Sequence, residues 1–168
     1  MYRRSVLAEL GGFDECLLTV EDEELDFRIT QRGGKILYAP GAIVYHRRRA
    51  SGRAFWAQMY RYAIGRAQFL KRHPRPAQWI RLLPSAWLLA TLALALLQQF
   101  SSMARRMLLL ELVLTISAWL GMATWLTKRS RLRDFPVFLT LLSLFGGAWA
   151  IGMLEGLWYR ARSDGHTR

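Results

Sequence analysis

Long apolar runs dominate the second half of the chain, whereas apolar and polar residues are mixed over residues 1–82. Three of the runs are long enough to cross a bilayer, which takes roughly 20 mostly apolar residues. They lie at about 83–100, 107–126 and 135–159. The first is short and ends in Gln98-Gln99, which makes it the weakest of the three. The pattern predicts about three transmembrane helices over 83–159, followed by a polar tail at 160–168.

Residues 21–32 have the pattern of a helix. Acidic residues fill its first turn, where the helix dipole favours them. Leu25 and Ile29 repeat at a spacing of four, and Gly33-Gly34 supply a stop signal. We therefore expect one amphipathic helix that starts at the acids and ends before the glycine pair.

Two short strands are expected after this helix. The segments at 35–40 (KILYAP) and 42–46 (AIVYH) are rich in β-forming residues and are separated by the turn pair Pro40-Gly41.

Residues 53–72 predict a second amphipathic helix, with Arg and Lys on much of its surface. Its apolar face is formed by Trp56, Tyr60, Ala63, Ala67 and Leu70. Such a helix can lie in the membrane interface, so we interpret 53–82 as an interfacial helix and linker. The alternative is a surface helix of the soluble domain.

Charge is as uneven as hydropathy. The 168-residue chain has a formal net charge of +12, yet eight of its twelve acids lie at or before Asp26. Residues 47–81 contain ten Lys or Arg and no acid. A basic stretch beside apolar runs is typical of a segment that binds an anionic membrane surface. Nucleic acid is the competing partner, but no nucleic-acid motif accompanies the patch.

The loops between the runs predict a topology. The loop after the second run contains four basic residues, Lys128, Arg129, Arg131 and Arg133. The loop after the first run contains two, Arg105 and Arg106. Since Lys and Arg accumulate on the cytoplasmic side, we expect a multi-pass protein of the inner membrane with its N-terminal domain in the cytoplasm.

The acids at 21–26 have two interpretations. Acidic residues at a helix start are common, and each stabilises it by roughly 0.3–1 kcal/mol. Five acids within six positions also repel one another, so the excess suggests a cation, a substrate or a proton. The local sequence leaves both interpretations open.

The flanking segments resemble a known family. In order, GGFDE (11–15), EDEELDFR (21–28) and GGKILYAPGAIVYH (33–46) resemble the C-terminal half of a family 2 glycosyltransferase catalytic domain. The segment at 57–76 is similar to the Gln-x-x-Arg-aromatic region of membrane members. Within the family, the sequence looks most like the bacterial exopolysaccharide type and is similar to the succinoglycan-synthesis glycosyltransferases. The resemblance implies an α/β, partial GT-A-like domain over residues 1–52, the acceptor half, followed by an α-helical region of about three membrane helices.

The resemblance also implies roles for individual residues. Asp22 matches the catalytic base that takes the acceptor's proton, with Glu21 as the second candidate. Gln58, Arg61 and Tyr62 match the acceptor-binding motif, although Tyr stands where Trp is usual, which puts processive polymerisation in doubt. These three are equally well explained as part of a packed helix face.

A metal role is implied for His46, near a divalent ion and diphosphate, although a lone His is more often a surface residue. Full-length relatives are expected to bind Mg²⁺ or Mn²⁺ through an Asp-x-Asp motif, whose oxygen ligands suit hard cations. This chain contains no Asp-x-Asp triplet.

The expected activity is transfer of a sugar from a nucleotide-sugar donor to a saccharide or lipid-linked acceptor, with inversion. The donor-binding half has no counterpart in the sequence, so we expect the chain alone to be inactive. It would be a truncated frame, or half of an enzyme that a separate chain completes. The alternative is a non-catalytic membrane protein whose basic helix docks on lipid.

Overall fold

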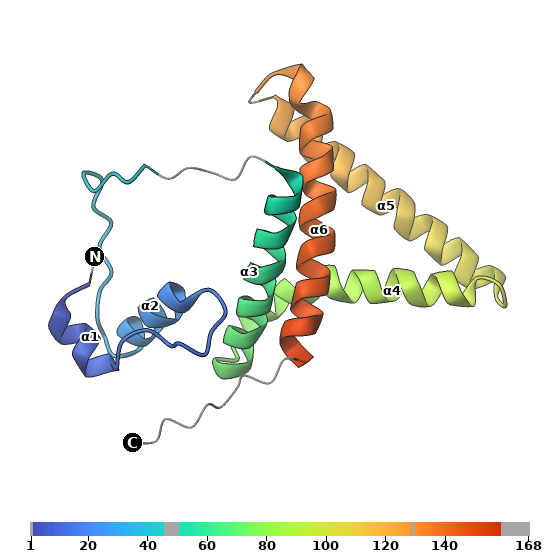
Figure 1. The fold of residues 1–168 in the computed structure, drawn as a ribbon. Helices are drawn as coiled ribbons and strands as arrows, with labels where there is room; N and C mark the ends of the chain where they lie inside the picture. Colours follow the sequence, from blue (N-terminus) through green and yellow to red (C-terminus); the bar gives the residue numbers. More distant parts are fainter. Residues whose placement is uncertain (1, 46–50, 129, 159–168) are drawn as a thin grey trace.

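The computed structural model describes residues 2–45, 51–128 and 130–158, and these residues are helical throughout their regular parts (Figure 1). The helices are α1 (Arg4–Leu10), α2 (Glu21–Gln31), α3 (Gly52–Arg72), α4 (Leu83–Leu97), α5 (Ser102–Thr127) and α6 (Phe135–Trp158). Two 3-10 helices, η1 (Pro76–Leu82) and η2 (Leu132–Asp134), lead into α4 and α6.

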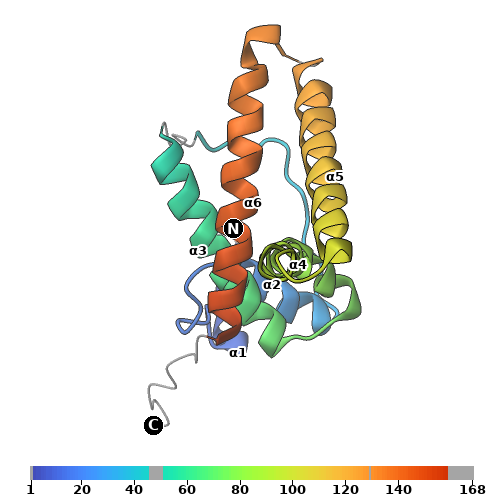
Figure 2. The ribbon, with the colours of Figure 1, turned by 90° about the vertical axis from the view of Figure 1, so that its right-hand side faces the viewer.

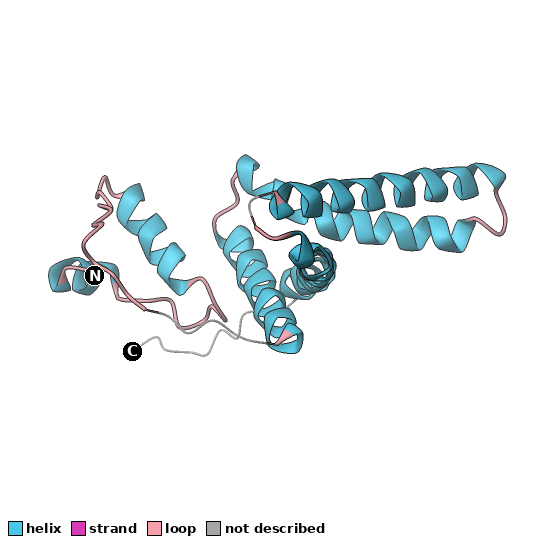
Figure 3. Cartoon of the chain, turned by 90° about the horizontal axis from the view of Figure 1, so that it is seen from above, coloured by secondary structure: helices cyan, strands magenta, loops and turns pink. Residues whose placement is uncertain are grey.

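The expected α/β, partial GT-A-like domain is wrong for the described residues, which contain no strand (Figure 3). Residues 35–45 are irregular apart from one turn, and no ladder of backbone hydrogen bonds, which a strand requires, joins them to a second described segment. Tyr38 and Tyr45 are 90% and 96% exposed. The turn at Pro40-Gly41 does form, with the Ala42 N–H donating to the Ala39 carbonyl at 3.0 Å.

The predicted acidic helix is confirmed as α2. It begins at Glu21 and ends one residue earlier than expected, with Arg32 at its C-cap. Gly33 follows with a φ of 79°, a conformation that glycine adopts without strain, and the Gly34 N–H donates to the Ile29 carbonyl at 3.0 Å.

The main packing of the molecule joins α3 to α6, which run side by side in the same direction (Figures 1 and 2). Glycines of α6 allow the close approach. A Cβ atom built on Gly156 would lie 2.7 Å from the Ala67 Cβ, and one on Gly147 would lie 3.0 Å from the Trp56 ring. Small residues of this kind let helix backbones come together.

The apolar face predicted for residues 53–72 is therefore a real packing face, because Trp56, Ala63 and Ala67 all contact α6. Its partner in the structure is another helix. The placement of this helix in a membrane interface stays a prediction.

The three apolar runs form helices long and apolar enough to span a membrane. The candidate spans are Pro76–Leu97, Ser102–Thr127 and Leu132–Trp158. In Figure 1, α4 extends away from the lower part of α6 and α5 returns diagonally to its upper end, so the three helices outline a triangle.

Polar contacts fix the corner of this triangle where α4 meets α6. The Ser85 hydroxyl donates to the Ala150 carbonyl at 2.9 Å, and the Trp149 indole donates to the Arg81 carbonyl at 3.0 Å. The first contact ties the start of α4 to α6, and the second ties the end of η1 to α6.

Candidate functional site

The loop at 11–20 brings the acidic helix to α3. Leu17 and Val20 are buried, and the Leu18 N–H donates to the buried Gln68 side-chain oxygen at 3.0 Å. The Thr19 hydroxyl donates to the Arg61 carbonyl at 3.1 Å. The loop is therefore anchored on α3 over the residues that immediately precede α2.

Close contact at Gly65 makes this docking possible. A Cβ atom at this position would lie 2.7 Å from the carbonyl oxygen of Thr19, well inside van der Waals contact. Only glycine leaves room for the loop here.

Val20 carries backbone strain at the start of α2. It is the N-cap residue, with φ 64° and ψ 22°, and its side chain makes no capping hydrogen bond. A β-branched residue in the left-handed region costs of order 1–3 kcal/mol and persists only where the surroundings enforce it. Here burial of the side chain and the anchored loop enforce it, one residue before the predicted catalytic pair.

Three acids near this loop, Asp14, Glu23 and Glu24, have cationic partners. Asp14 forms an ion pair with Arg72 at the end of α3. Glu23 pairs with Arg66, and Arg81 lies 3.6 Å from the same carboxylate oxygen. Glu23 therefore joins α2 to α3 and to η1.

Glu24 is the most buried of the acids. Its carboxylate accepts hydrogen bonds from the Arg28 Nε at 2.7 and 2.9 Å, and the Nε2 of His73 lies 3.1 Å away. Arg28 also donates to the carbonyls of Leu10 and Gly12. This cluster, Glu24–Arg28–His73, holds α2 between the loop after α1 and the end of α3.

Glu21 and Asp22, the first two acids of α2, lie outside these ion pairs. Both side chains are exposed. One Asp22 oxygen accepts a hydrogen bond from the Glu23 N–H at 2.8 Å, and neither residue forms an ion pair within the described part of the chain. The two predicted catalytic residues are thus the acids of this run that structural pairing leaves available.

The predicted acceptor motif lies on α3, adjoining the loop. The Gln58 amide donates to the Tyr62 hydroxyl at 3.2 Å, and the Tyr62 and Arg61 side chains are exposed. Because the Arg61 carbonyl accepts a hydrogen bond from Thr19, this motif is joined directly to the loop that precedes Glu21. No hydrogen bond in the described residues joins the motif to Glu21 or Asp22.

Sequence reasoning missed His73, which is packed between aromatic rings. Its ring centroid is 4.5 Å from that of Phe27 and 5.2 Å from that of Phe69, and the Arg75 guanidinium lies 4.3 Å from the Phe27 ring centroid. The sequence signal that could have identified it is its position directly after Lys71 and Arg72 at the end of the predicted helix, where a His side chain can reach an acid of a neighbouring segment.

Tyr2 was also missed. Its hydroxyl donates to the Asp26 carboxylate at 2.8 Å. Burial, followed by this hydrogen bond and by the negative charges of Asp26 and Asp22, raises the pKa of Tyr2 to about 12.

The described residues do not gather the ligands of a divalent metal. Among the described residues no group of three or more His, Cys, Asp or Glu side chains is placed to hold an ion. Hard cations such as Mg²⁺ require several oxygen ligands, and Glu21 and Asp22 offer two carboxylates at most. His46, the predicted metal residue, lies outside the described residues.

The described residues define a helical protein with three candidate membrane spans and a free acid pair beside a basic helix. The family model described as Glycosyl transferase family group 2 matches residues 1–151. The chain therefore belongs to that family.

Two kinds of curated relative match part of the chain. A pre-mycofactocin glycosyltransferase of Mycobacterium tuberculosis is 35% identical over 72 residues, or 43% of this chain and 15% of the relative. A probable glycosyltransferase of Bacillus subtilis, YdaM, is 36% identical over 63 residues, or 38% of this chain and 15% of the relative. The match thus spans about 15% of the length of these relatives. No solved structure matches the chain significantly.

Proposed function

We propose that the chain forms the acceptor side of a membrane glycosyltransferase that moves a sugar from a nucleotide-sugar donor to a saccharide or lipid-linked acceptor. Membership of the family supports sugar transfer. The observation that carries the proposal is the exposed pair Glu21–Asp22, whose neighbours Asp14, Glu23 and Glu24 are all held by cationic partners.

Asp22 is the proposed base, and Glu21 is the second candidate. The Asp22 carboxylate takes the proton of the acceptor hydroxyl while the oxygen of that hydroxyl forms a bond to C1 of the sugar. The bond between C1 and the diphosphate breaks on the opposite face, and the diphosphate leaves with the electron pair. Attack opposite the leaving group inverts the configuration at C1.

The proposed acceptor contacts are on the exposed side of α3. The Tyr62 ring can stack on a sugar face, and the Gln58 amide, which donates to the Tyr62 hydroxyl, fixes the orientation of the ring. Arg61 is exposed beside them, next to the anchored loop.

Donor binding requires groups beyond those described. The expected Mg²⁺ or Mn²⁺ does not fit the described side chains, so no step is assigned to a metal here. We propose that the donor site comes from a separate chain, or from protein corresponding to the rest of the relatives' length. The three apolar helices support a multi-pass membrane protein, for which we propose a cytoplasmic site and a role in exopolysaccharide or cell-envelope glycan synthesis.

The alternative, a non-catalytic protein whose basic helix docks on lipid, receives less support. Arg66 and Arg72, two of the cations on α3, pair with Glu23 and Asp14. These cations hold the acidic loop and helix.

The test is Asp22→Asn in the chain together with its donor-binding complement, measured by transfer of labelled sugar. Loss of a general base is expected to slow transfer by about 10²- to 10⁴-fold, with membrane insertion unchanged. Glu9→Gln, an exposed acid outside the site, is the matched control. Unchanged transfer by Asp22→Asn would reject this residue as the base, and the same measurement on Glu21→Gln would test the second candidate.

A further inference from the structure

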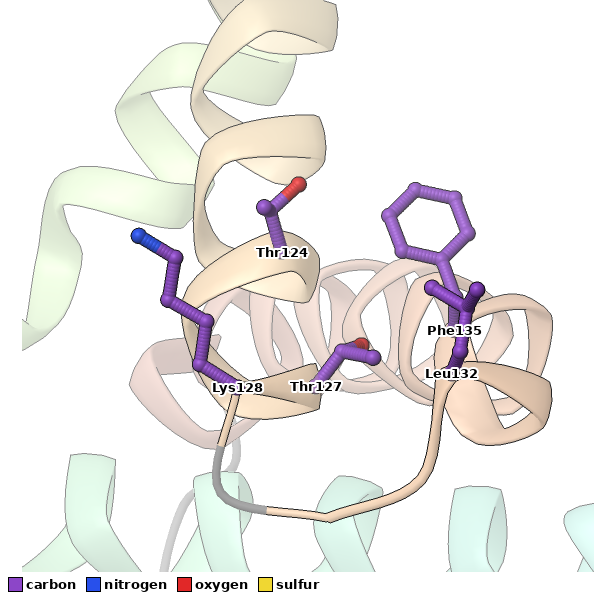
Figure 4. A pocket seen from close by; sticks show the side chains of 5 residues that line it. All are labelled: Thr124, Thr127, Lys128, Leu132 and Phe135. Carbon is purple, nitrogen blue, oxygen red and sulfur yellow. The ribbon is translucent and has the colours of Figure 1, made fainter.

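A pocket of about 450 Å³ lies where α5 ends and α6 begins (Figure 4). It is far along the chain from the acidic site and plays no part in the proposed transfer. Its lining residues are Thr124, Thr127, Lys128, Leu132 and Phe135. The first three lie on one face of the last turn of α5, and the other two come from η2 and the start of α6.

The lining is apolar although it contains two threonines. The Thr124 hydroxyl donates to the Leu120 carbonyl at 2.7 Å, and the Thr127 hydroxyl donates to the Ala123 carbonyl at 2.7 Å. Both hydroxyls are therefore satisfied within α5. Leu132 is 84% exposed at the mouth of the pocket, so the site presents hydrocarbon that water solvates poorly.

Basic residues lie at the pocket and next to it in the chain. Lys128 lines the pocket, Arg131 is the N-cap residue of η2, and Arg133 belongs to η2. The one acid near them, Asp134, accepts a hydrogen bond from the Arg131 N–H at 3.2 Å. In the described part of the chain, Lys128 and Arg133 form no ion pair, so this turn has an excess of positive charge.

The position along the helices identifies the kind of ligand. The pocket lies at the ends of two candidate spans, where the phosphates of a bilayer would be met. Basic pockets between membrane helices bind anionic lipid headgroups, and juxtamembrane Lys and Arg attract them. A free anion would leave the apolar lining unused, and a neutral lipid would leave the cations unmatched.

We infer that this pocket binds an anionic phospholipid. One acyl chain lies against Leu132, Phe135 and the threonine methyl groups, and the phosphate is held at the Lys128 ammonium. The lipid covers the turn between α5 and α6, and the binding does not depend on the proposed glycosyl transfer.

The test uses the whole chain in a neutral detergent, titrated with phosphatidylglycerol or with phosphatidylcholine of the same acyl chains. Binding is read by native mass spectrometry and by the shift in thermal midpoint. We expect phosphatidylglycerol to bind at least about fivefold more tightly than phosphatidylcholine, because one Lys or Arg near an anionic lipid contributes about 1 kcal/mol. Equal binding of the two lipids would overturn the inference.

Variants separate the two parts of the site. Lys128→Gln is expected to weaken phosphatidylglycerol binding about fivefold and leave phosphatidylcholine unchanged, whereas Leu132→Ser weakens both. Arg105→Gln, a basic residue at the other end of α5, is the matched control and should change neither. The inference fails if Lys128→Gln behaves like Arg105→Gln, or if inorganic phosphate alone produces the full thermal shift.

Discussion

The Thr19 hydroxyl donates a hydrogen bond to the Arg61 carbonyl at 3.1 Å, joining two segments that are 42 residues apart in the chain. Thr19 precedes the free acids of α2, and Arg61 belongs to the proposed acceptor motif. This contact and the ion pairs of Asp14 and Glu23 give the candidate site a fixed position on α3.

Gly65→Ala tests how closely the loop is docked. A methyl group at this position would overlap the Thr19 backbone, so we expect unfolding to become easier by about 1–3 kcal/mol. Limited proteolysis within the loop at 11–20 should also become faster. The control is Gly121→Ala on α5, where nothing lies within 4 Å of the added methyl and a gain of about 0.5–1 kcal/mol is expected. If Gly65→Ala also raised the free energy of unfolding, the loop at 11–20 would not pack against Gly65.

Glu24→Gln tests the buried acid of α2. Its carboxylate side chain is 4% exposed and serves both Arg28 and His73, so removal of the charge leaves a partly buried cation without its partner. We expect a loss of about 3 kcal/mol in the free energy of unfolding. Glu9→Gln is the comparison, because the Glu9–Arg32 pair is exposed, with a separation of 3.5 Å, and should contribute less than about 1 kcal/mol. Similar losses for the two variants would contradict the assignment.

Tyr2 is expected to ionise at unusually high pH. Its pKa is raised to about 12 from a usual value of 10.0, so the protonated form is favoured in the folded state. The stability that this phenol contributes is therefore complete below pH 10 and is lost as the pH rises from 10 towards 12. The ultraviolet titration curve of the native chain, after subtraction of the curve of the Tyr2→Phe variant, measures this transition directly.

Asp26→Asn is the matched variant for Tyr2. It removes the charge that opposes phenolate formation, so the pKa of Tyr2 should fall, while burial keeps it above 10. A Tyr2 titration that is identical in the two proteins would show that the hydrogen bond to Asp26 is absent in solution.

Glu111→Gln is expected to preserve or raise stability. Glu111 is buried in α5, 2.7 Å from the Thr91 hydroxyl, and its second oxygen is buried without a partner. The Thr91 hydroxyl also reaches the Trp87 carbonyl at 3.0 Å, and one hydrogen cannot serve both acceptors. A Gln amide can donate to Thr91 and free that hydrogen for Trp87. A drop of more than about 1 kcal/mol in detergent unfolding would show that the carboxylate itself is required.

The helices were predictable because their signals are local. The acidic first turn and Gly33 mark the ends of α2, and the apolar periodicity of 53–72 marks the face that α3 packs against α6. The strands at 35–40 and 42–46 were not correctly predicted, because a strand depends on a neighbour that propensity does not supply. The described residues provide no such neighbour.

The candidate site was predictable only in part. Family resemblance singled out Glu21 and Asp22, but the sequence did not show that Glu23 and Glu24 are held by Arg66 and His73. Those partners lie more than 40 residues away, and several basic residues of the same segment were equally plausible. The three-dimensional path of the loop decides between them.

The pairing of α3 with α6 has a consequence for biosynthesis. The Tyr60 hydroxyl of α3 donates a hydrogen bond to the Glu155 carboxylate of α6, and the two residues are 95 positions apart in the chain. At roughly 5–20 residues per second, α3 waits about 5–20 seconds on the ribosome before its partner is made. During that interval its apolar face is uncovered, so a nascent chain that stalls before α6 presents a target for chaperones and proteases.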